Sequence, residues 1–282
     1  MTTHRARLIR CGSFRLDGGG MFGIVPRAIW RHAIPPDDEN CIRLETNALL
    51  LETIDGGATR RVLVECGYGD KWAAKERAIY AFEGRTAVDA LREIGVSPDS
   101  IDHVIVTHLH FDHAGGLTRL DGSGSPEPVF PRADVIVQRR EWEDALAGRS
   151  TMTRTYLRSH LDPIADRVRL VDGAEEVLPG IVVEPMPGHT WGQQSVRFSD
   201  DRGVVCFPGD VMPTVHHAGT AYSMAYDMLP YENMRSKLRL LSRAAEERWR
   251  LVLDHEPGNP VVCVQREGDA ERTRWSLAAA SL

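Results

Sequence analysis

The sequence predicts an α/β protein in which mixed sheets are covered by helices. Short apolar runs rich in β-branched residues recur along the chain, for example at 43–52, 61–65 and 103–107, and each is typical of a strand. Helical patterns lie among them at 85–94 and 139–146. The chain has 282 residues, of which 42% are hydrophobic, and this is enough for a large core. Strands paired through turns and then mixed with helices favour sheets packed against helices.

Turn and stop signals divide the first half of the chain. The Asp-Gly-Gly turn at 55–57 separates the first two strands. Gly95 ends the first helix and Pro98 follows it. The strand over 103–107 leads directly into a segment rich in histidine. Further strands are expected at 133–138, 181–184, 195–198, 204–207, 251–253 and 261–264.

The longest helical pattern lies in the second half, at 231–249, where Leu238, Leu241 and Ala244 repeat at the spacing of one helix face. The stretch 121–131 is rich in glycine, serine and proline, but it is too short for a domain linker and is expected to be a surface loop. We therefore expect a single domain over residues 1–282.

Composition and charge exclude several classes of protein. The net charge is −6, which disfavours nucleic acid as a partner because phosphate binding needs a clustered basic face. No apolar run follows the basic residues at the start, so no secretory signal is predicted, and no stretch is long and apolar enough to span a membrane. The five cysteines are widely spaced and odd in number, which is typical of free thiols. We expect a cytoplasmic protein that binds no membrane.

The segment THLHFDHAGG, residues 107–116, is the strongest functional signal. In an extended chain His108 and His110 point to the same side and can face one metal ion. Asp112 and His113 fall in the following turn and can face a second position. A single buried histidine is usually a structural residue, but four metal-binding side chains within six positions after a β-branched strand are hard to explain in that way. Imidazole and carboxylate ligands suit zinc, and also iron, manganese or cobalt.

Three later residues can complete such a site, because each follows a predicted strand. His189 lies in the turn between the strands over 181–184 and 195–198, and Asp210 and His255 each come just after a strand end. Strand ends gathered at one edge of a sheet are a common place for binding sites. The other histidines lack this context and are expected to be structural or solvated, with His160 on a surface helix. They are His4, His32, His103 and His160.

The order HxHxDH, then His, Asp and His, resembles the pattern of the metallo-β-lactamase superfamily, from about Asn47 to His255. The resemblance implies an αββα sandwich, with two mixed sheets flanked by helices and the metals at one edge. It also implies that His108, His110 and His189 bind a first metal, that Asp112, His113 and His255 bind a second, and that Asp210 bridges both.

The resemblance further implies hydrolysis by a hydroxide that bridges two divalent metal ions, because two such ions lower the pKa of a shared water. Zinc is the expected metal, with iron, manganese and cobalt as alternatives. Asp112 would hold the hydroxide and pass a proton to the leaving oxygen, which makes it the expected catalytic residue.

The chain resembles one branch of the superfamily in particular. The stretches 17–30, 43–52 and 225–247 are similar to the quorum-quenching acyl-homoserine lactonases and their phosphotriesterase-like relatives. In that branch the N-terminal loop region, here 1–40, packs over the active site. Apolar residues of this region would then form a wall beside the substrate, although a hydrophobic plug that ties the N-terminus to the core fits equally well. The expected substrate contacts are Met21, Phe22, Ile24, Trp30, His216 and Tyr222.

The chain departs from this branch at Pro213, where many such lactonases have a tyrosine that binds the substrate carbonyl. Tyr222, Tyr226, His216 and His217 are the candidates to replace it. The predicted function is therefore hydrolysis of a lactone or a related ester, and a homodimer is the oligomeric state considered. A phosphotriester or aryl-ester hydrolase, an iron-dependent redox enzyme and a non-catalytic binding protein of the same fold are the alternatives.

Overall fold

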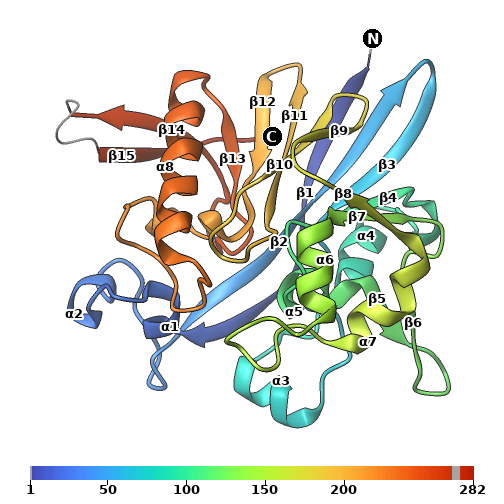
Figure 1. The fold of residues 1–282 in the computed structure, drawn as a ribbon, viewed down its shortest axis with the longest axis horizontal. Helices are drawn as coiled ribbons and strands as arrows, with labels where there is room; N and C mark the ends of the chain where they lie inside the picture. The colour runs from blue at the N-terminus through green and yellow to red at the C-terminus, as the bar shows by residue number, and fades with distance from the viewer. Residues whose placement is uncertain (1, 269–273) are drawn as a thin grey trace.

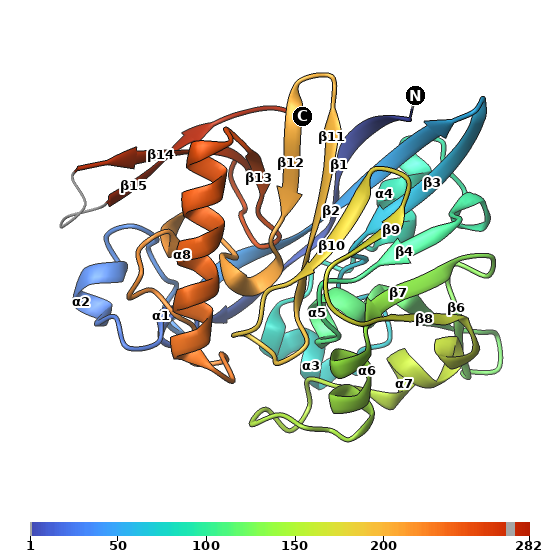
Figure 2. The same ribbon diagram turned by 45° about the horizontal axis from the view of Figure 1, so that its top comes forward.

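Two β-sheets face each other and helices cover the outer face of each, as the computed structural model shows for residues 2–268 and 274–282 (Figure 1). The predicted αββα sandwich is thereby confirmed. Figure 2, in which the molecule is turned by 45°, shows α8 outside one sheet and α6 and α7 on the side of the other. The loops that carry the predicted metal ligands lie together at one end of the sandwich.

The first sheet is mixed and has six strands in the order β1-β2-β3-β4-β7-β8. β1, β2 and β3 pair antiparallel, whereas β4, β7 and β8 continue the sheet in parallel. Its strands are β1 (Thr3–Asp17), β2 (Cys41–Asp55), β3 (Ala58–Val64), β4 (His103–Ile105), β7 (Asp134–Gln138) and β8 (Val168–Val171).

The second sheet is also mixed and has seven strands in the order β15-β14-β13-β12-β11-β10-β9. Only the pair β12 and β13 is parallel among its described strands. Its strands are β9 (Glu175–Leu178), β10 (Ile181–Pro185), β11 (Gln194–Asp200), β12 (Gly203–Phe207), β13 (Arg250–Val252), β14 (Val261–Glu267) and β15 (Arg274–Ala279). The expected surface loop at 121–131 lies within a small hairpin of β5 (Thr118–Leu120) and β6 (Pro126–Pro128).

A continuous apolar core fills the space between the sheets. Leu51 and Ile105 of the first sheet and Val196 and Phe207 of the second belong to it and are fully buried. Burial of each such side chain contributes about 1.5–3 kcal/mol to the free energy of unfolding. Because the strands present one apolar face to this core and the other to a helix layer, most central strands are apolar on both faces.

Helices close the outer faces. α4 (Ala87–Glu93) begins at Thr86, whose hydroxyl and the Asp89 carboxylate form a capping box. α4 and α6 (Arg139–Leu146) cover the first sheet, and α8 (Pro230–Glu246) packs Leu240 and Leu241 on the second. No helix within the described residues has the length and apolar character needed to cross a membrane. The short helices are α1 (Gly18–Phe22), α2 (Arg27–Trp30), α3 (Ala74–Tyr80), α5 (Phe111–Ala114) and α7 (Arg158–Leu161).

The N-terminal region differs from the predicted loop over residues 1–40. Residues Thr3–Asp17 form the long edge strand β1, which pairs with β2 along its length. The pairing shifts between Arg10 and Ser13, and Gly12 within this bulge has φ = 121°, a conformation that favours glycine. Charged and apolar residues alternate only over the short stretches 5–8 and 14–17, and the bulge separates them, so pairing with β2 rather than one continuous pattern defines the strand.

His160 lies on a helix, α7, as predicted, and of the two expected outcomes it is structural rather than solvated. Its side chain is buried, and its ring packs edge-on against Trp72 with ring centroids 5.8 Å apart. Burial lowers the pKa of His160 to about 3, so the imidazole is neutral.

Candidate metal centre

The metal-binding side chains predicted from the sequence come from loops at one edge of the two sheets. His108 and His110 follow β4, and α5 carries Asp112 and His113. The loops of the second sheet contribute the remaining residues. They are His189 between β10 and β11, Asp210 in the short helix Gly209–Val211 after β12, and His255 after β13. The structure thus brings together all seven side chains, from segments up to about half the chain apart.

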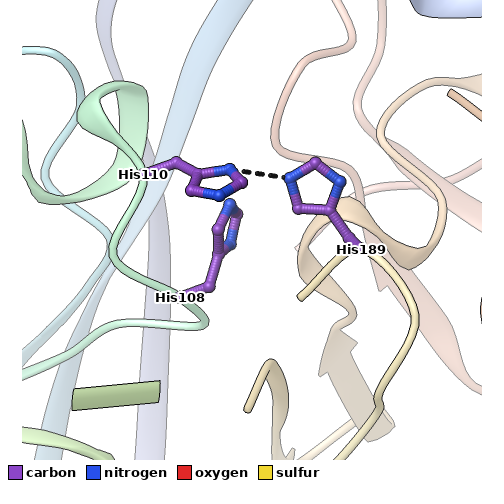
Figure 3. Close-up of side chains that lie close together, drawn as sticks. All are labelled: His108, His110 and His189. Carbon is purple, nitrogen blue, oxygen red and sulfur yellow. Dashed lines mark hydrogen bonds between the residues drawn. The ribbon is translucent and has the colours of Figure 1, made fainter. Parts of the chain in front are cut away.

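Three imidazoles converge in the first group, which consists of His108, His110 and His189. Figure 3 shows the rings of His108 and His110 rising from one loop towards the ring of His189 on the opposite loop. His189 Nε2 lies 2.9 Å from His110 Nδ1. All three residues are buried, and burial together with the neighbouring imidazoles holds the pKa of His108 and His110 well below the usual value. Both rings are therefore neutral, which is the form that binds a metal.

Asp210 lies between this group and a second one. Its Oδ2 is 3.1 Å from His189 Nε2 and 4.0 Å from His108 Nε2. Its Oδ1 is 3.3 Å from His255 Nε2 and 3.7 Å from His113 Nε2. Each oxygen of one carboxylate therefore faces a different set of imidazoles, which is the arrangement that a bridging ligand needs.

The second group contains His113, Asp210, Asp254 and His255. Asp112 is beside it, with its oxygens 3.5 Å from His255 Nε2 and 3.9 Å from His113 Nε2. Asp254 is an addition that sequence reasoning missed, although a carboxylate next to His255 was a signal that could have identified it. Burial opposes the change, but the carboxylates of Asp254 and Asp210 raise the pKa of His255 to about 10.

Hydrogen bonds to Nδ1 orient three of the imidazoles. Asp227 Oδ1 lies 3.0 Å from His189 Nδ1, Glu65 Oε2 lies 3.1 Å from His113 Nδ1, and the backbone oxygen of Glu45 lies 2.7 Å from His255 Nδ1. Each of these acceptors holds a proton on Nδ1, so Nε2, which faces the centre, is the nitrogen that would bind a metal after it loses its own proton. None of the three acceptors was predicted from the sequence, because they lie 38 to 210 residues from the histidines that they orient.

Buried polar atoms without a protein partner support the presence of metal ions. The Nε2 atoms of His108, His110 and His113 and Oδ1 of Asp210 have no hydrogen-bond partner among the described residues. Such atoms are costly to bury unless something binds them. These four atoms and Oδ2 of Asp254, which also has no partner in the described part of the chain, lie together in the two groups above, so the donor set fits two divalent cations held by imidazole and carboxylate.

A cavity of about 330 Å³ opens onto the centre. The predicted metal ligands His110, Asp112 and Asp210 form its polar floor, and most of the remaining wall is apolar or aromatic. A segment between α6 and α7 covers one side, where Arg154 forms an ion pair of 2.9 Å with Glu76 of α3. The other lining residues are Leu16, Met21, Tyr80, Phe111, Met152, Thr153, Thr155, His189, Met224, Tyr226 and His255.

The residues predicted to contact substrate fall into two sets. Met21 lines the cavity. Phe22 and Trp30 are buried outside it, where their rings stack with centroids 5.2 Å apart, so they form the hydrophobic plug that was the alternative interpretation. Ile24 is 85% exposed and points away from the cavity lining. The predicted apolar wall is therefore built from Met21 together with residues of other segments.

The four residues considered as replacements for a tyrosine at position 213 also differ in whether they reach the cavity. His216 and Tyr222 are half-buried and outside the cavity lining. His217 is buried against Phe22, and its Nε2 lies 2.8 Å from the backbone oxygen of Met21, so it is engaged in the fold. Tyr226 lines the cavity, as does Tyr80, which was not predicted.

A family model described as the metallo-beta-lactamase superfamily matches residues 42–255. The N-acyl homoserine lactonase AiiA of Bacillus thuringiensis subsp. kurstaki is 31% identical to the chain over 155 residues. This alignment covers 55% of the chain and 53% of that relative, so the chain spans about half the length of the curated relatives that it matches first.

Solved structures match almost the whole chain. A probable metal-dependent hydrolase from Staphylococcus aureus has a TM-score of 0.85 at 25% identity, and the match covers 99% of this chain and 98% of that one. AidC, a dizinc quorum-quenching lactonase in complex with a product, has a TM-score of 0.78 at 16% identity, with 99% and 96% covered. At that identity the likeness to AidC shows the fold alone.

Proposed function

Because the chain belongs to the metallo-beta-lactamase superfamily, we propose that it is a metal-dependent hydrolase that opens a lactone or cleaves a related ester. The observation that carries this proposal is the position of Asp210, which directs one carboxylate oxygen to each of two clusters of imidazoles. When bound in such a centre, two divalent ions lower the pKa of water towards neutrality and polarise a carbonyl oxygen.

In this proposal His108, His110 and His189 hold one ion, and His113, His255 and Asp112 hold the other, with Asp210 shared. Asp254 is close enough to the second group to take part in holding its ion. Zinc is the expected metal, because its ligands in proteins are imidazole and carboxylate groups at this kind of spacing.

Asp112 is the proposed proton carrier. Like Asp210, it faces the second group and lines the cavity, but it does not lie between the two groups and is therefore the carboxylate assigned to proton transfer. There it can accept a proton from the attacking water and release it to the leaving alkoxide, which is a poor leaving group without that proton.

The cavity favours a substrate with an apolar part. Leu16, Met21 and Met224 supply apolar surface beside the polar floor, which suits the acyl portion of a lactone or an ester. The hydroxyls of Tyr226 and Tyr80 are the proposed hydrogen-bond donors to the substrate carbonyl in place of a residue at position 213. Burial raises the pKa of Tyr226 to about 12, so this hydroxyl keeps its proton at neutral pH.

A hydrolysis screen on metal-loaded protein tests the proposal. We expect turnover of lactones and of activated aryl esters, with lactones better, and weaker turnover of phosphotriesters. The same preparation should bind about two divalent ions per chain. Oxygen consumption in place of hydrolysis, or no turnover at full metal content, would contradict the proposal. A homodimer and a cytoplasmic location stay predictions.

A further inference from the structure

Glu141 on α6 is a fully buried carboxylate outside the set of metal-binding residues. Its Oε1 accepts hydrogen bonds from the backbone N–H of Leu109 at 2.9 Å and from the hydroxyl of Tyr156 at 3.0 Å. Its Oε2 accepts a third from the hydroxyl of Thr190 at 2.6 Å. The three donors come from three different segments of the chain, and one side chain therefore fixes their relative positions.

Each donor adjoins a histidine of the first group. Leu109 lies between His108 and His110 in the sequence, and Thr190 follows His189 directly. The ring of Tyr156 packs against the imidazole of His110, with ring centroids 5.1 Å apart. Glu141 thus holds a neighbour of every imidazole in that group, whereas Asp227 pairs with the ring of His189 itself, at Nδ1.

The loop of His189 approaches α6 unusually closely. A Cβ atom at Gly192 would clash with the backbone nitrogen of Glu141, so the absence of a side chain at 192 allows the contact. This approach brings the Thr190 hydroxyl within reach of the carboxylate. Tyr156 belongs to the segment that also places Thr153, Arg154 and Thr155 in the cavity wall, so the same carboxylate joins that wall to the imidazoles.

Stability alone does not explain this residue. A buried carboxylate is expensive to desolvate, and apolar side chains of similar volume often stabilise such positions equally well. Its three hydrogen bonds offset this cost and, at the same time, determine the distance between the loops of His108 and His189. A carboxylate with this set of partners is therefore better explained by geometry than by stability.

We propose that Glu141 is a positioning residue for the three-imidazole group. By fixing the positions of the three rings, it sets the affinity of that group for its metal ion. This inference rests on the proposed function, since it requires that the group binds a metal. Groups hydrogen-bonded to metal ligands typically change metal affinity about 10–100-fold when they are altered, and Glu141, which acts through neighbours of the ligands, is expected towards the lower end of that range.

The test uses Glu141→Gln with Asp144→Asn as the matched control. Asp144 is a second buried carboxylate on the same helix, but its side chain pairs with the guanidinium groups of Arg140 and Arg149 and is not hydrogen-bonded to a neighbour of the three imidazoles within the described residues. The apo proteins are titrated with Co²⁺ against a competing chelator, and the absorption bands of bound Co²⁺ are recorded. We expect Glu141→Gln to weaken one of two binding steps about 10–100-fold and to change its spectrum. Asp144→Asn should match the native titration.

Tyr156→Phe is a milder second variant, because it removes one donor and keeps the ring against His110. It should weaken the same binding step by a smaller factor. Three results would overturn the inference and leave the proposed function intact. The first is a native binding curve for all three variants. The others are equal weakening in Asp144→Asn and equal weakening of both binding steps in Glu141→Gln. A native protein that binds no Co²⁺ would instead contradict the proposed function itself.

Discussion

At the scale of single residues, the centre depends on carboxylates that each face more than one imidazole. Asp210 contacts both groups through different oxygens, and Asp112 contacts both His113 and His255. Asp112 differs from Asp210 in that it reaches the centre from α5, beside the wall formed by Phe111. A side chain in that place can exchange protons with a substrate as well as bind a metal.

Asp112→Asn should separate these two roles. The amide keeps an oxygen for a metal but cannot carry a proton, and proton transfer by a positioned side chain contributes about 10²–10⁴-fold to rate. We expect kcat for lactones to fall by about 100-fold or more, and kcat for aryl esters with phenolate leaving groups to fall less. Metal content is measured on the same samples. Equal losses on the two substrates at full metal content would leave Asp112 as a metal ligand only.

Gly20 controls the position of the Tyr226 hydroxyl. A Cβ at position 20 would clash with that oxygen, so Gly20→Ala should displace it from the cavity. Loss of one hydrogen bond to a developing oxyanion typically costs about 10²–10³ in kcat, and a displaced donor should cost part of this. Tyr226→Phe should show the full loss in a steady-state assay.

Gly19→Ala is the control for this prediction. It lies in the same short helix, and its Cβ would be 2.9 Å from the Asp17 carboxylate, which caps this helix, but would not meet Tyr226. Turnover in Gly19→Ala should remain near native. If Gly20→Ala and Tyr226→Phe both keep native kcat, Tyr226 does not polarise the substrate.

At the scale of elements, the short helices α1 and α2 place some residues in the core, and α1 places an adjacent residue in the cavity wall. Phe22 and Trp30 stack on one side of α1, and Phe22 also stacks on His217 from the second sheet's loops, with ring centroids 4.9 Å apart. Met21, one residue before, faces the cavity instead. Adjacent positions of one helix point in different directions, so the plug and the wall are different faces of the same short element.

Trp30→Ala and Met21→Ser should therefore have different effects. Removal of a buried tryptophan typically costs about 3–5 kcal/mol in the free energy of unfolding, and we expect this in a denaturant titration of Trp30→Ala, with KM near native. Met21→Ser should raise KM for apolar substrates roughly tenfold, which corresponds to about 1.4 kcal/mol of lost contact. A large rise in KM for Trp30→Ala alone would place that residue at the substrate instead.

At the scale of the whole molecule, the centre joins the two halves of the sandwich. Its first four side chains follow strands of the first sheet, and His189, Asp210 and His255 follow strands of the second. Ions held between these loops would link the sheets at the edge where the intersheet core ends. Metal binding should thus stabilise the fold as a whole, since an unfolded chain has no such site.

Metal removal should lower the melting temperature, and Asp210→Ala should lose one ion or both while it keeps the fold. Elemental analysis of the native chain should give about two divalent ions. Stabilisation by a metal at 1,000 times its Kd is about 4 kcal/mol, which is measurable by thermal unfolding with and without chelator. An unchanged melting temperature after complete metal removal would contradict this link between the sheets.

Two buried histidines outside the metal-binding set predict a loss of stability in acid. Burial lowers the pKa of His160 and of His217 to about 3 in the folded protein. The unfolded chain, with a histidine pKa near 6.5, binds protons first as the pH falls. Each therefore reduces the free energy of unfolding by about 1.4 kcal/mol per pH unit between pH 6.5 and 3.

His160→Gln tests this dependence on metal-free protein. The variant should show a smaller slope of the free energy of unfolding against pH between pH 6.5 and 4, measured by denaturant titration at each pH. The slope, rather than the absolute stability, is the quantity compared, because the substitution also changes packing against Trp72. An unchanged slope would mean that His160 is protonated in the folded protein.

The sequence by itself determined the elements whose signals are local. The helix over 139–146 begins and ends where it was predicted, and the hairpin turn falls at Gly56 and Gly57, because side-chain period and turn residues act over a few positions. The metal-binding side chains of the HxHxDH segment were predictable for the same reason, since their spacing along one loop is part of the sequence.

Only the tertiary structure decided which distant groups meet. β1 was missed because its stability comes from pairing with β2 rather than from its own apolar pattern. Ile24 and Met21 look alike in the sequence, yet one is exposed and the other lines the cavity. Glu141 contacts groups 15 to 49 residues away. Spacing along the chain fixes neighbours within one element, but contacts between loops depend on how the two sheets pack, and that packing minimises the free energy of the whole chain.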